Sequence, residues 1–366
     1  MSPRTAVAWG SLGLLAYAQA GYPLLLAGLR RLRGPAPPPA AASAEPRVSL
    51  IVAAHREAQV IEEKVANARA LDWPADRLEV IVACDGSPDD TPARARAAGA
   101  DVVLELAWGG KVRAQDAAVD AASGELLAFS DANARWEPGA LRALAGAFAD
   151  PGVGYACGQV RFIGEGGTNQ EGLYWRYEMA IRALESELSS VTAGNGAIYA
   201  VRPEAYLRVD PVMGHDLSLP FQLVKRGWRA VYAPDARATE KMVPTIEGEF
   251  ARKRRMMSHA WPIVLRAGLL DPRGYPPLYA LMVFSHRALR YASPFLHLGA
   301  LQPRARVAFA AQAAVLAAAA LGGRVRARPL LVARYYVLTV ASIPAGLWDH
   351  LRHGTPAGWA PPEGTR

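Results

Sequence analysis

Two short hydrophobic runs in this chain of 366 residues each end on an aspartate. Residues 78–84 lead to Asp85, and residues 126–130 lead to Asp131. Between the two runs, Lys111 follows two glycines. Ligands of open α/β sheets bind at the carboxyl ends of the strands. Two acidic strand ends and a glycine-flanked lysine suit a nucleoside diphosphate and its metal, so the pattern indicates an enzyme that handles an activated nucleotide.

Strand and helix patterns alternate from residue 48 to about residue 261 and would position these side chains. Strands are expected at residues 48–54, 78–84, 102–106 and 126–130. Helices are expected at about residues 61–71, from residue 89, at residues 112–122 and from residue 137. This rhythm predicts a doubly wound α/β fold with a mostly parallel sheet. The first strand is not followed by G-x-G-x-x-G, the dinucleotide-binding fingerprint of dehydrogenases.

Beyond residue 153 the alternation becomes irregular. Residues 194–200 are typical of a glycine-rich turn that leads into a strand, and His215 opens a helix that runs to about Arg226. A further helix is expected at residues 245–259. On it, Arg252 and Arg255 are three residues apart and share one face. Two interpretations of this basic face stay open: it neutralises a diphosphate, or it rests on anionic lipid.

Residues 6–29 contain no charged side chain and are long enough to span a bilayer with some tilt. Arg30, Arg31 and Arg33 follow at once, which predicts that this end faces the cytoplasm. A cleaved signal peptide is the alternative, but its positive charge precedes a shorter apolar core. We therefore expect a retained transmembrane anchor over residues 1–30, followed by a Pro- and Ala-rich linker over residues 31–47.

Apolar segments return near the end of the chain. Residues 307–321 are alanine-rich, and residues 330–348 are apolar apart from Arg334. Residues 279–301 are mixed, with His286, Arg287 and Arg290 at helical spacing. This third segment either spans the bilayer or lies in the interface with its basic face toward the headgroups. The number of spans therefore stays open by one.

The net charge of +8 comes largely from arginines, many of which flank apolar segments. Membrane-flanking charge explains this pattern better than nucleic-acid binding, which would require basic residues interleaved with aromatic ones on one face. No nucleic-acid partner is expected. The two cysteines, Cys84 and Cys157, form no C-x-x-C or Cys/His cluster, so a structural zinc site is not expected either. Cys84 is interpreted as a small core residue.

Taken in order, these residues resemble glycosyltransferase family 2, the inverting enzymes of the GT-A fold. The resemblance covers roughly residues 47–261. It rests on Ala54-His55-Arg56-Glu57 in place of a Tyr-Asn-Glu turn, Asp85-Gly86-Ser87, Gly109-Gly110-Lys111, Asp131-Ala132-Asn133 at the Asp-x-Asp position, His215-Asp216 at an acidic pair, and Arg252 to Arg255 at a Gln-x-x-Arg-Trp motif. Met256 stands where that tryptophan would be, which favours a non-processive enzyme over a polymer synthase.

The resemblance implies that a nucleoside diphosphate is displaced from the anomeric carbon of a sugar. By resemblance, Asp85 contacts the base or ribose, and Glu57 helps to hold the nucleoside. Lys111 contacts the phosphates, because its ammonium group and the N-terminus of the following helix both favour anions. Arg252 and Arg255 would neutralise the leaving diphosphate.

The metal and the base are also implied by the resemblance. Asp131 and Asn133 would flank the diphosphate and a Mg²⁺ or Mn²⁺ ion, which prefer oxygen ligands. Because Asn133 is an amide, the metal would depend more heavily on the phosphates of the substrate. Asp216 would take the proton from the attacking hydroxyl. His215 would tune the pKa of Asp216 or contact the acceptor.

The resulting expectation is a GT-A domain at residues 48–262, with a nucleotide-binding half and an acceptor half. Membrane-associated and transmembrane helices follow at residues 275–350, with a tail at residues 351–366. The enzyme would be a multi-pass protein of the cell's inner membrane with its catalytic domain in the cytoplasm. It would transfer a sugar from a nucleotide sugar, expected to be a UDP-sugar, to a lipid-linked or saccharide acceptor in polysaccharide or glycolipid synthesis. The alternatives are a sugar-phosphate nucleotidyltransferase and a non-catalytic membrane scaffold that retains the fold.

Overall fold

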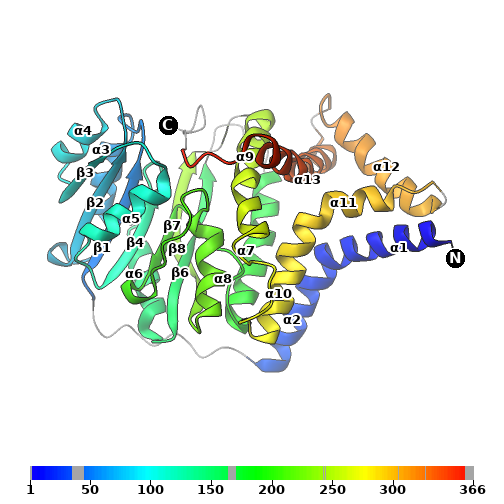
Figure 1. Ribbon diagram of the computed structural model, residues 1–366, viewed down its shortest axis with the longest axis horizontal. Helices are drawn as coiled ribbons and strands as arrows, with labels where there is room; N and C mark the ends of the chain where they lie inside the picture. The colour runs from blue at the N-terminus through cyan, green and yellow to red at the C-terminus, as the bar shows by residue number, and fades with distance from the viewer. Residues whose placement is uncertain are drawn as a thin grey trace.

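The computed structural model describes residues 2–34, 45–163, 170–241, 243, 245–303, 305–325 and 327–358. Within these residues, one mixed sheet of eight strands forms the centre of the molecule. Across the sheet the strands are β3 (Val102–Leu106), β2 (Leu78–Asp85), β1 (Val48–Ala54), β4 (Leu126–Asp131), β7 (Ile198–Val201), β6 (Val153–Ile163), β8 (Arg229–Lys241) and β5 (Arg135–Trp136). Figure 1 shows helices packed against this sheet and a separate group of helices extending from one end.

The first four strands across the sheet, β3 to β4, run parallel to one another. Every residue of β1 is buried, as expected for a parallel strand that is covered on both faces. The predicted parallel α/β half is therefore confirmed. Beyond it, β7 runs antiparallel to both β4 and β6, so the second half of the sheet is mixed.

The predicted helices of this half are present and follow the strands. They are α3 (Ile61–Arg69), α4 (Thr91–Ala97), α5 (Lys111–Ala121) and α6 (Ala140–Gly146). On α3 the apolar face at Ile61, Val65 and Ala68 is fully buried, which explains why helical periodicity identified this segment. Two helices of the second half also start where the sequence places them. They are α8 (His215–Lys225) and α9 (Ile246–Leu265).

The longest elements that were not predicted from the sequence are β6, β8 and helix α7 (Gln170–Leu188). Strands β6 and β8 pair in parallel, with irregular register after Val153 and after Cys157. A Cβ atom on Gly158 would lie 2.2 Å from the carbonyl oxygen of Ala236, so a glycine is required where the two strands approach. Irregular register interrupts the period-two pattern by which a strand is recognised in sequence.

Two groups of helices from opposite ends of the chain pack together. The N-terminal group is α1 (Pro3–Ala16), a π-helical turn (Tyr17–Gly21) and α2 (Tyr22–Arg33). The C-terminal group is α10 (Pro277–Met282), the π-helical turn η5 (Val283–Ala288), α11 (Leu289–Ala300), α12 (Arg306–Leu321) and α13 (Arg328–His353). Figure 1 shows α1, α11 and α12 projecting away from the sheet. By length and composition, the helical stretches Pro3–Arg33 and Arg328–His353 are long and apolar enough to cross a membrane. Most of the predicted linker lies outside the described residues.

The basic face of residues 279–301 is turned into the protein, which disfavours the alternative in which this face contacts lipid headgroups. His286 and Arg287 are buried, and the Nδ1 atom of His286 lies 2.7 Å from a carboxylate oxygen of Glu185 on α7. Arg290 forms an ion pair with Glu178, also on α7. These carboxylates belong to an element that the sequence did not reveal, so the partners of the basic face were not foreseeable.

Candidate active site

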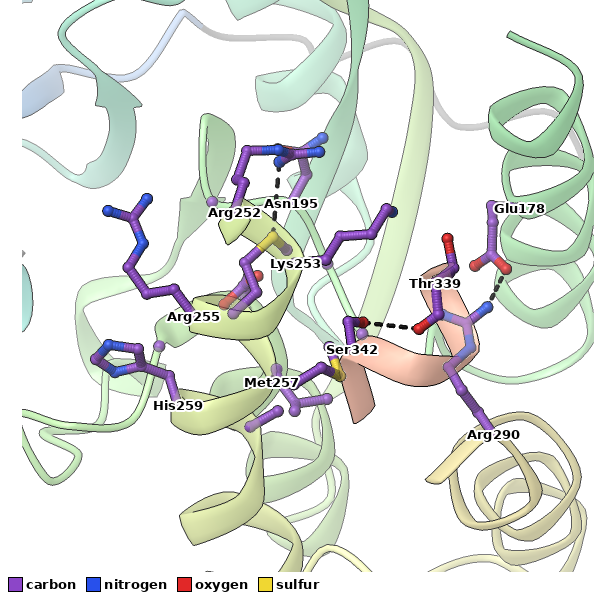
Figure 2. A pocket seen from close by; sticks show the side chains of 18 of the residues that line it. Glu178, Asn195, Arg252, Lys253, Arg255, Met257, His259, Arg290, Thr339 and Ser342 are labelled. Carbon is purple, nitrogen blue, oxygen red and sulfur yellow. Dashed lines mark hydrogen bonds and ion pairs between the residues drawn. The ribbon is translucent and has the colours of Figure 1, made fainter. Parts of the chain in front are cut away.

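One large cavity, of about 870 Å³, lies at the carboxyl ends of β1 and β4 and continues between α7, α9, α11 and α13. Eight of the site residues that the sequence indicated line it: Glu57, Lys111, Asp131, Asn133, His215, Asp216, Arg252 and Arg255. Asp85 is not among the lining residues. Figure 2 shows the part of this cavity that α9 and α13 border. The sequence series thus comes together in one place, as expected for residues that share a substrate.

Lys111 and Asp131 form the polar centre of the nucleotide-binding half. Helix α5 begins at Lys111, directly after Gly110, whose φ of +101° favours glycine. Strand β4 ends at Asp131, and the ammonium group of Lys111 forms an ion pair with its carboxylate. Burial alone would lower the pKa of Lys111, but Asp131 and then Asp216 raise it above its ordinary value. Lys111 is therefore a fixed positive charge at the edge of the cavity.

Asp216 lies in the first turn of α8 and faces the same space. Its backbone carbonyl accepts a hydrogen bond from the amide of Gly194 at 2.6 Å, which joins the glycine-rich turn to the start of the helix. A Cβ atom placed on Gly196 would lie 3.7 Å from Nζ of Lys111 and 3.9 Å from Cβ of Asp216. Gly196 thus lies beside both charged side chains, and all three residues line the cavity.

His215 points into the core behind Asp216. Its Nδ1 atom lies 2.8 Å from the hydroxyl of Tyr199, and its ring meets the ring of Tyr206 edge-on. Burial, and then the charge of Lys111, lowers the pKa of His215 to about 3. The ring is therefore neutral near pH 7, and its packing supports the start of α8. The roles that the sequence suggested for His215 stay predictions.

Asp85 holds the loop that precedes Lys111. It is 1% exposed, and its two carboxylate oxygens accept hydrogen bonds from the amides of Gly109 at 2.7 Å and Gly110 at 2.9 Å. A carboxylate at a strand end thus fixes the backbone of the glycine pair. The contact between Asp85 and a nucleoside stays a prediction.

Glu57 occupies the turn after β1, four residues before α3. Its side chain is buried and lines the cavity, and its amide donates a hydrogen bond to Oγ1 of Thr91 at 3.0 Å. The preceding residue, Arg56, has a φ of +55°, the one positive φ among the non-glycine residues that the structure describes. This uncommon conformation is consistent with a constrained turn that directs Glu57 inward.

The basic residues of α9 differ in their partners. Both guanidinium nitrogens Nε and Nη2 of Arg252 contact the carboxylate of Glu249, at 2.7 and 2.8 Å, and Lys253 lies 3.3 Å from the same group. Arg254 forms a two-point ion pair with Asp349 of α13. Figure 2 shows Arg255 projecting from the same side of α9 as His259. The basic run is thus divided between the cavity and the contact with α13.

Two groups near the site carried no signal in the sequence. Lys64 of α3 is buried, and its Nζ donates a hydrogen bond at 2.7 Å to the carbonyl of Ala134, just beyond the Asp131 turn. Burial lowers the pKa of Lys64 to about 7, against the opposing effect of Asp131. The second group is the buried pairing of Glu178 and Glu185 with the basic face of η5 and α11 described above. In the sequence these charged residues stand alone, and they can be recognised as buried and paired only once their partners in the fold are known.

The oxygen ligands at the end of β4 fit a divalent cation that is shared with a diphosphate. Asp131 supplies a carboxylate and Asn133 an amide oxygen, and both line the cavity beside Lys111. Among the described residues, no group of three or more His, Cys, Asp or Glu side chains is arranged to hold a metal ion. A cation here would therefore need further oxygen ligands from the substrate, as Mg²⁺ commonly does.

Comparisons with known proteins agree with this geometry. Residues 49–206 match Glycosyl transferase family 2. The beta-monoglucosyldiacylglycerol synthase of Synechocystis sp. (strain ATCC 27184 / PCC 6803 / Kazusa) is 33% identical over 164 residues, which make up 42% of this chain and 33% of that protein. The chain thus spans about a third of the length of this curated relative.

A solved structure matches nearly the whole chain. The mannosyltransferase PcManGT from Pyrobaculum calidifontis, in complex with GDP-Man and Mn²⁺, superposes with a TM-score of 0.75 at 25% sequence identity. The superposition covers 95% of this chain and 99% of that one. The family match and this likeness favour a transferase over the nucleotidyltransferase alternative. Residues 49–206 therefore form a glycosyltransferase family 2 domain, and the chain has the GT-A fold.

Proposed function

We propose that the chain is a membrane-bound, inverting glycosyltransferase that transfers a hexose from a nucleoside diphosphate sugar to a hydroxyl group of a lipid acceptor. The observation that carries this proposal is that one cavity connects a charged end with a partly apolar end among the helices. One end holds Lys111, Asp131 and Asp216, and the other runs between α9 and α13, where Val340 and Ile343 contribute apolar surface. A sugar nucleotide suits the charged end, and a lipid-borne hydroxyl suits the end among the helices.

The membrane part of the proposal is supported by two helical stretches of sufficient length, Pro3–Arg33 and Arg328–His353. Exposed apolar side chains lie on both, among them Leu24 and Leu32 on the first and Trp348 and Leu351 on the second. Surface of this kind is expected to contact lipid. The similarity to a glucosyldiacylglycerol synthase supports a lipid acceptor as well. We expect a cytoplasmic catalytic domain, because Arg30, Arg31 and Arg33 follow the first stretch.

In the proposed reaction, Asp216 accepts the proton of the acceptor hydroxyl while the hydroxyl oxygen attacks the anomeric carbon from the side opposite the diphosphate. The bond from the anomeric carbon to the phosphate oxygen breaks, and the nucleoside diphosphate leaves with the electron pair. Lys111 neutralises part of its growing negative charge. Asp131 and Asn133 would hold a Mg²⁺ or Mn²⁺ ion, which supplies further positive charge to the diphosphate when bound. Arg255 borders the same space and would act on the same charge.

The direct test is transfer activity of the purified full chain in lipid nanodiscs with Mn²⁺. A panel of UDP- and GDP-hexoses serves as donors, and diacylglycerol, a polyprenyl phosphate and a free disaccharide serve as acceptors. We expect a glycosylated lipid product of inverted anomeric configuration. Transfer to the free saccharide alone, or to the phosphate of the polyprenyl phosphate alone, would contradict a lipid hydroxyl as the acceptor. Retention of configuration would contradict Asp216 as the base.

A further inference from the structure

The last described residues of the chain, 354–358, lie across the glycine loop that precedes Lys111. We refer to residues 354–358 as the C-terminal strap. A Cβ atom on Gly110 would lie 2.2 Å from the carbonyl oxygen of Ala357, and one on Gly358 would lie 2.0 Å from the ring of Trp108. The contact at Gly110 is with backbone and is close enough to require glycine there. Figure 1 shows the chain returning from α13 toward the ends of the strands.

The strap is anchored at its start. Oγ1 of Thr355 donates a hydrogen bond to the backbone carbonyl of Ser258 on α9 at 2.9 Å. The same hydroxyl lies 2.9 Å from Nδ1 of His350 on α13. Because the single hydroxyl proton is directed to Ser258, the imidazole donates and the hydroxyl accepts. The left-handed φ of +72° at Gly354 ends α13 and turns the chain toward this anchor.

The loop under the strap is held from two sides. Asp85 accepts hydrogen bonds from the amides of Gly109 and Gly110, and Ala357 of the strap contacts Gly110. Ala357 also lines the cavity that contains Lys111 and Asp131. The strap is thus a wall of the polar end of the cavity as well as a restraint on the loop.

We propose that the C-terminal strap is part of the binding site for the nucleoside diphosphate sugar, where it positions the loop before Lys111 and retains the bound donor. This inference rests on the proposed function and deepens it. Ordering a binding loop before the ligand arrives lowers the entropic cost of binding. Because the strap continues α13, donor affinity also depends on the contact between α13 and α9.

The experiment compares three variants with the full chain, all in the same detergent. A chain that ends at His353 lacks the strap, whereas a control chain that ends at Gly358 keeps it. Thr355→Val retains the strap and removes its hydroxyl anchor. Calorimetry measures the affinity for UDP and for GDP in the presence of Mn²⁺, and hydrogen exchange measures the protection of the loop amides at residues 109–110.

Loss of the strap is expected to weaken nucleotide binding at least about tenfold and to speed exchange in the loop, while the control chain stays within about twofold of the full chain. Thr355→Val is expected to give an intermediate loss, and it serves as the test if the shorter chain does not fold. Equal or tighter binding without the strap would overturn the inference. Unchanged hydrogen exchange at residues 109–110 in the chain without the strap would refute the positioning role. If the full chain itself bound no nucleotide, the proposed function would fail instead.

Discussion

Lys111 and Asp131 form an ion pair across the mouth of the nucleotide-binding half, one from the first residue of α5 and one from the last residue of β4. The pairing keeps both charges in place before any substrate is present. In the proposed site, a diphosphate would contact the ammonium group of Lys111 directly, and it would contact the Asp131 carboxylate only through a cation. The proposed site would therefore bind phosphate in two ways, directly through Lys111 and indirectly through a cation on Asp131.

The first prediction concerns Lys111→Met, which removes the positive charge and leaves a side chain of similar length. Hydrogen bonds to charged groups contribute about 1.5–3 kcal/mol, so the affinity for a nucleoside diphosphate should fall about 10- to 100-fold. Calorimetry with Mn²⁺ present measures the loss. Arg226→Gln, an exposed change at the end of α8 that is not among the residues lining the cavity, is the control and should leave the affinity unchanged. Similar losses in both variants would point to a general charge effect rather than a contact of Lys111.

The second prediction separates the base from the donor site. Asp216→Asn keeps the shape of the side chain and removes its ability to take a proton. The transfer rate kcat should fall by about 10²- to 10⁴-fold, the usual contribution of a general base. Nucleotide affinity should stay close to that of the unchanged chain. The exposed change Glu204→Gln provides the control. Retention of full transfer activity by Asp216→Asn would exclude this residue as the base.

The parallel half of the fold was predictable because its information is local. A parallel strand buried on both faces is a continuous apolar run, and for β1 and β3 the expected bounds equal the observed ones. The second half was not predictable in the same way. In β6, Gly158 is required by the approach of Ala236, a residue far away in the sequence, and the register is irregular beside it.

The same distinction applies to the site. Asp131 at a strand end, and Lys111 and Asp216 at helix starts, were indicated as site residues because they belong to a series of motifs in a fixed order along the chain. The sequence did not indicate that Asp85 is engaged by the backbone of Gly109 and Gly110. Nor did it indicate that a segment beyond α13 covers that loop. Both are tertiary contacts between segments that lie far apart in the sequence, and neither segment carries a pattern that indicates its partner.

The third prediction uses the neutral, buried state of His215. Its pKa is about 3 in the folded chain, whereas an unfolded histidine titrates near its ordinary value of 6.5. Between these values the unfolded chain binds a proton that the folded chain does not, so stability falls as the pH is lowered from about 6.5 toward 3. The slope from this group reaches about 1.4 kcal/mol per pH unit.

His215→Asn should reduce this dependence, because the amide oxygen can still accept the hydrogen bond from Tyr199 and cannot become charged. Thermal unfolding at a series of pH values, followed by tryptophan fluorescence, gives the comparison. His353→Asn, an exposed change at the end of α13, serves as the control. An identical acid profile for His215→Asn and the unchanged chain would contradict a buried neutral imidazole.

The last prediction concerns the contact between α13 and the catalytic domain. A Cβ atom on Gly346 would lie 2.5 Å from Cβ of Met257 and 2.8 Å from the carbonyl oxygen of Arg254, both on α9. Gly346→Ala must therefore push the two helices apart, and overpacking of this kind costs about 1–3 kcal/mol.

Gly28→Ala in α2 is the matched control, because a Cβ there meets nothing within 4 Å. An alanine normally stabilises a helix by about 0.5–1 kcal/mol relative to glycine, so the two variants should change stability in opposite directions. The midpoint of thermal unfolding in detergent measures both changes. Displacement of α13 in Gly346→Ala should also weaken nucleotide binding, because the C-terminal strap begins where this helix ends. If Gly346→Ala stabilised the protein instead, the close packing of α13 on α9 would be ruled out.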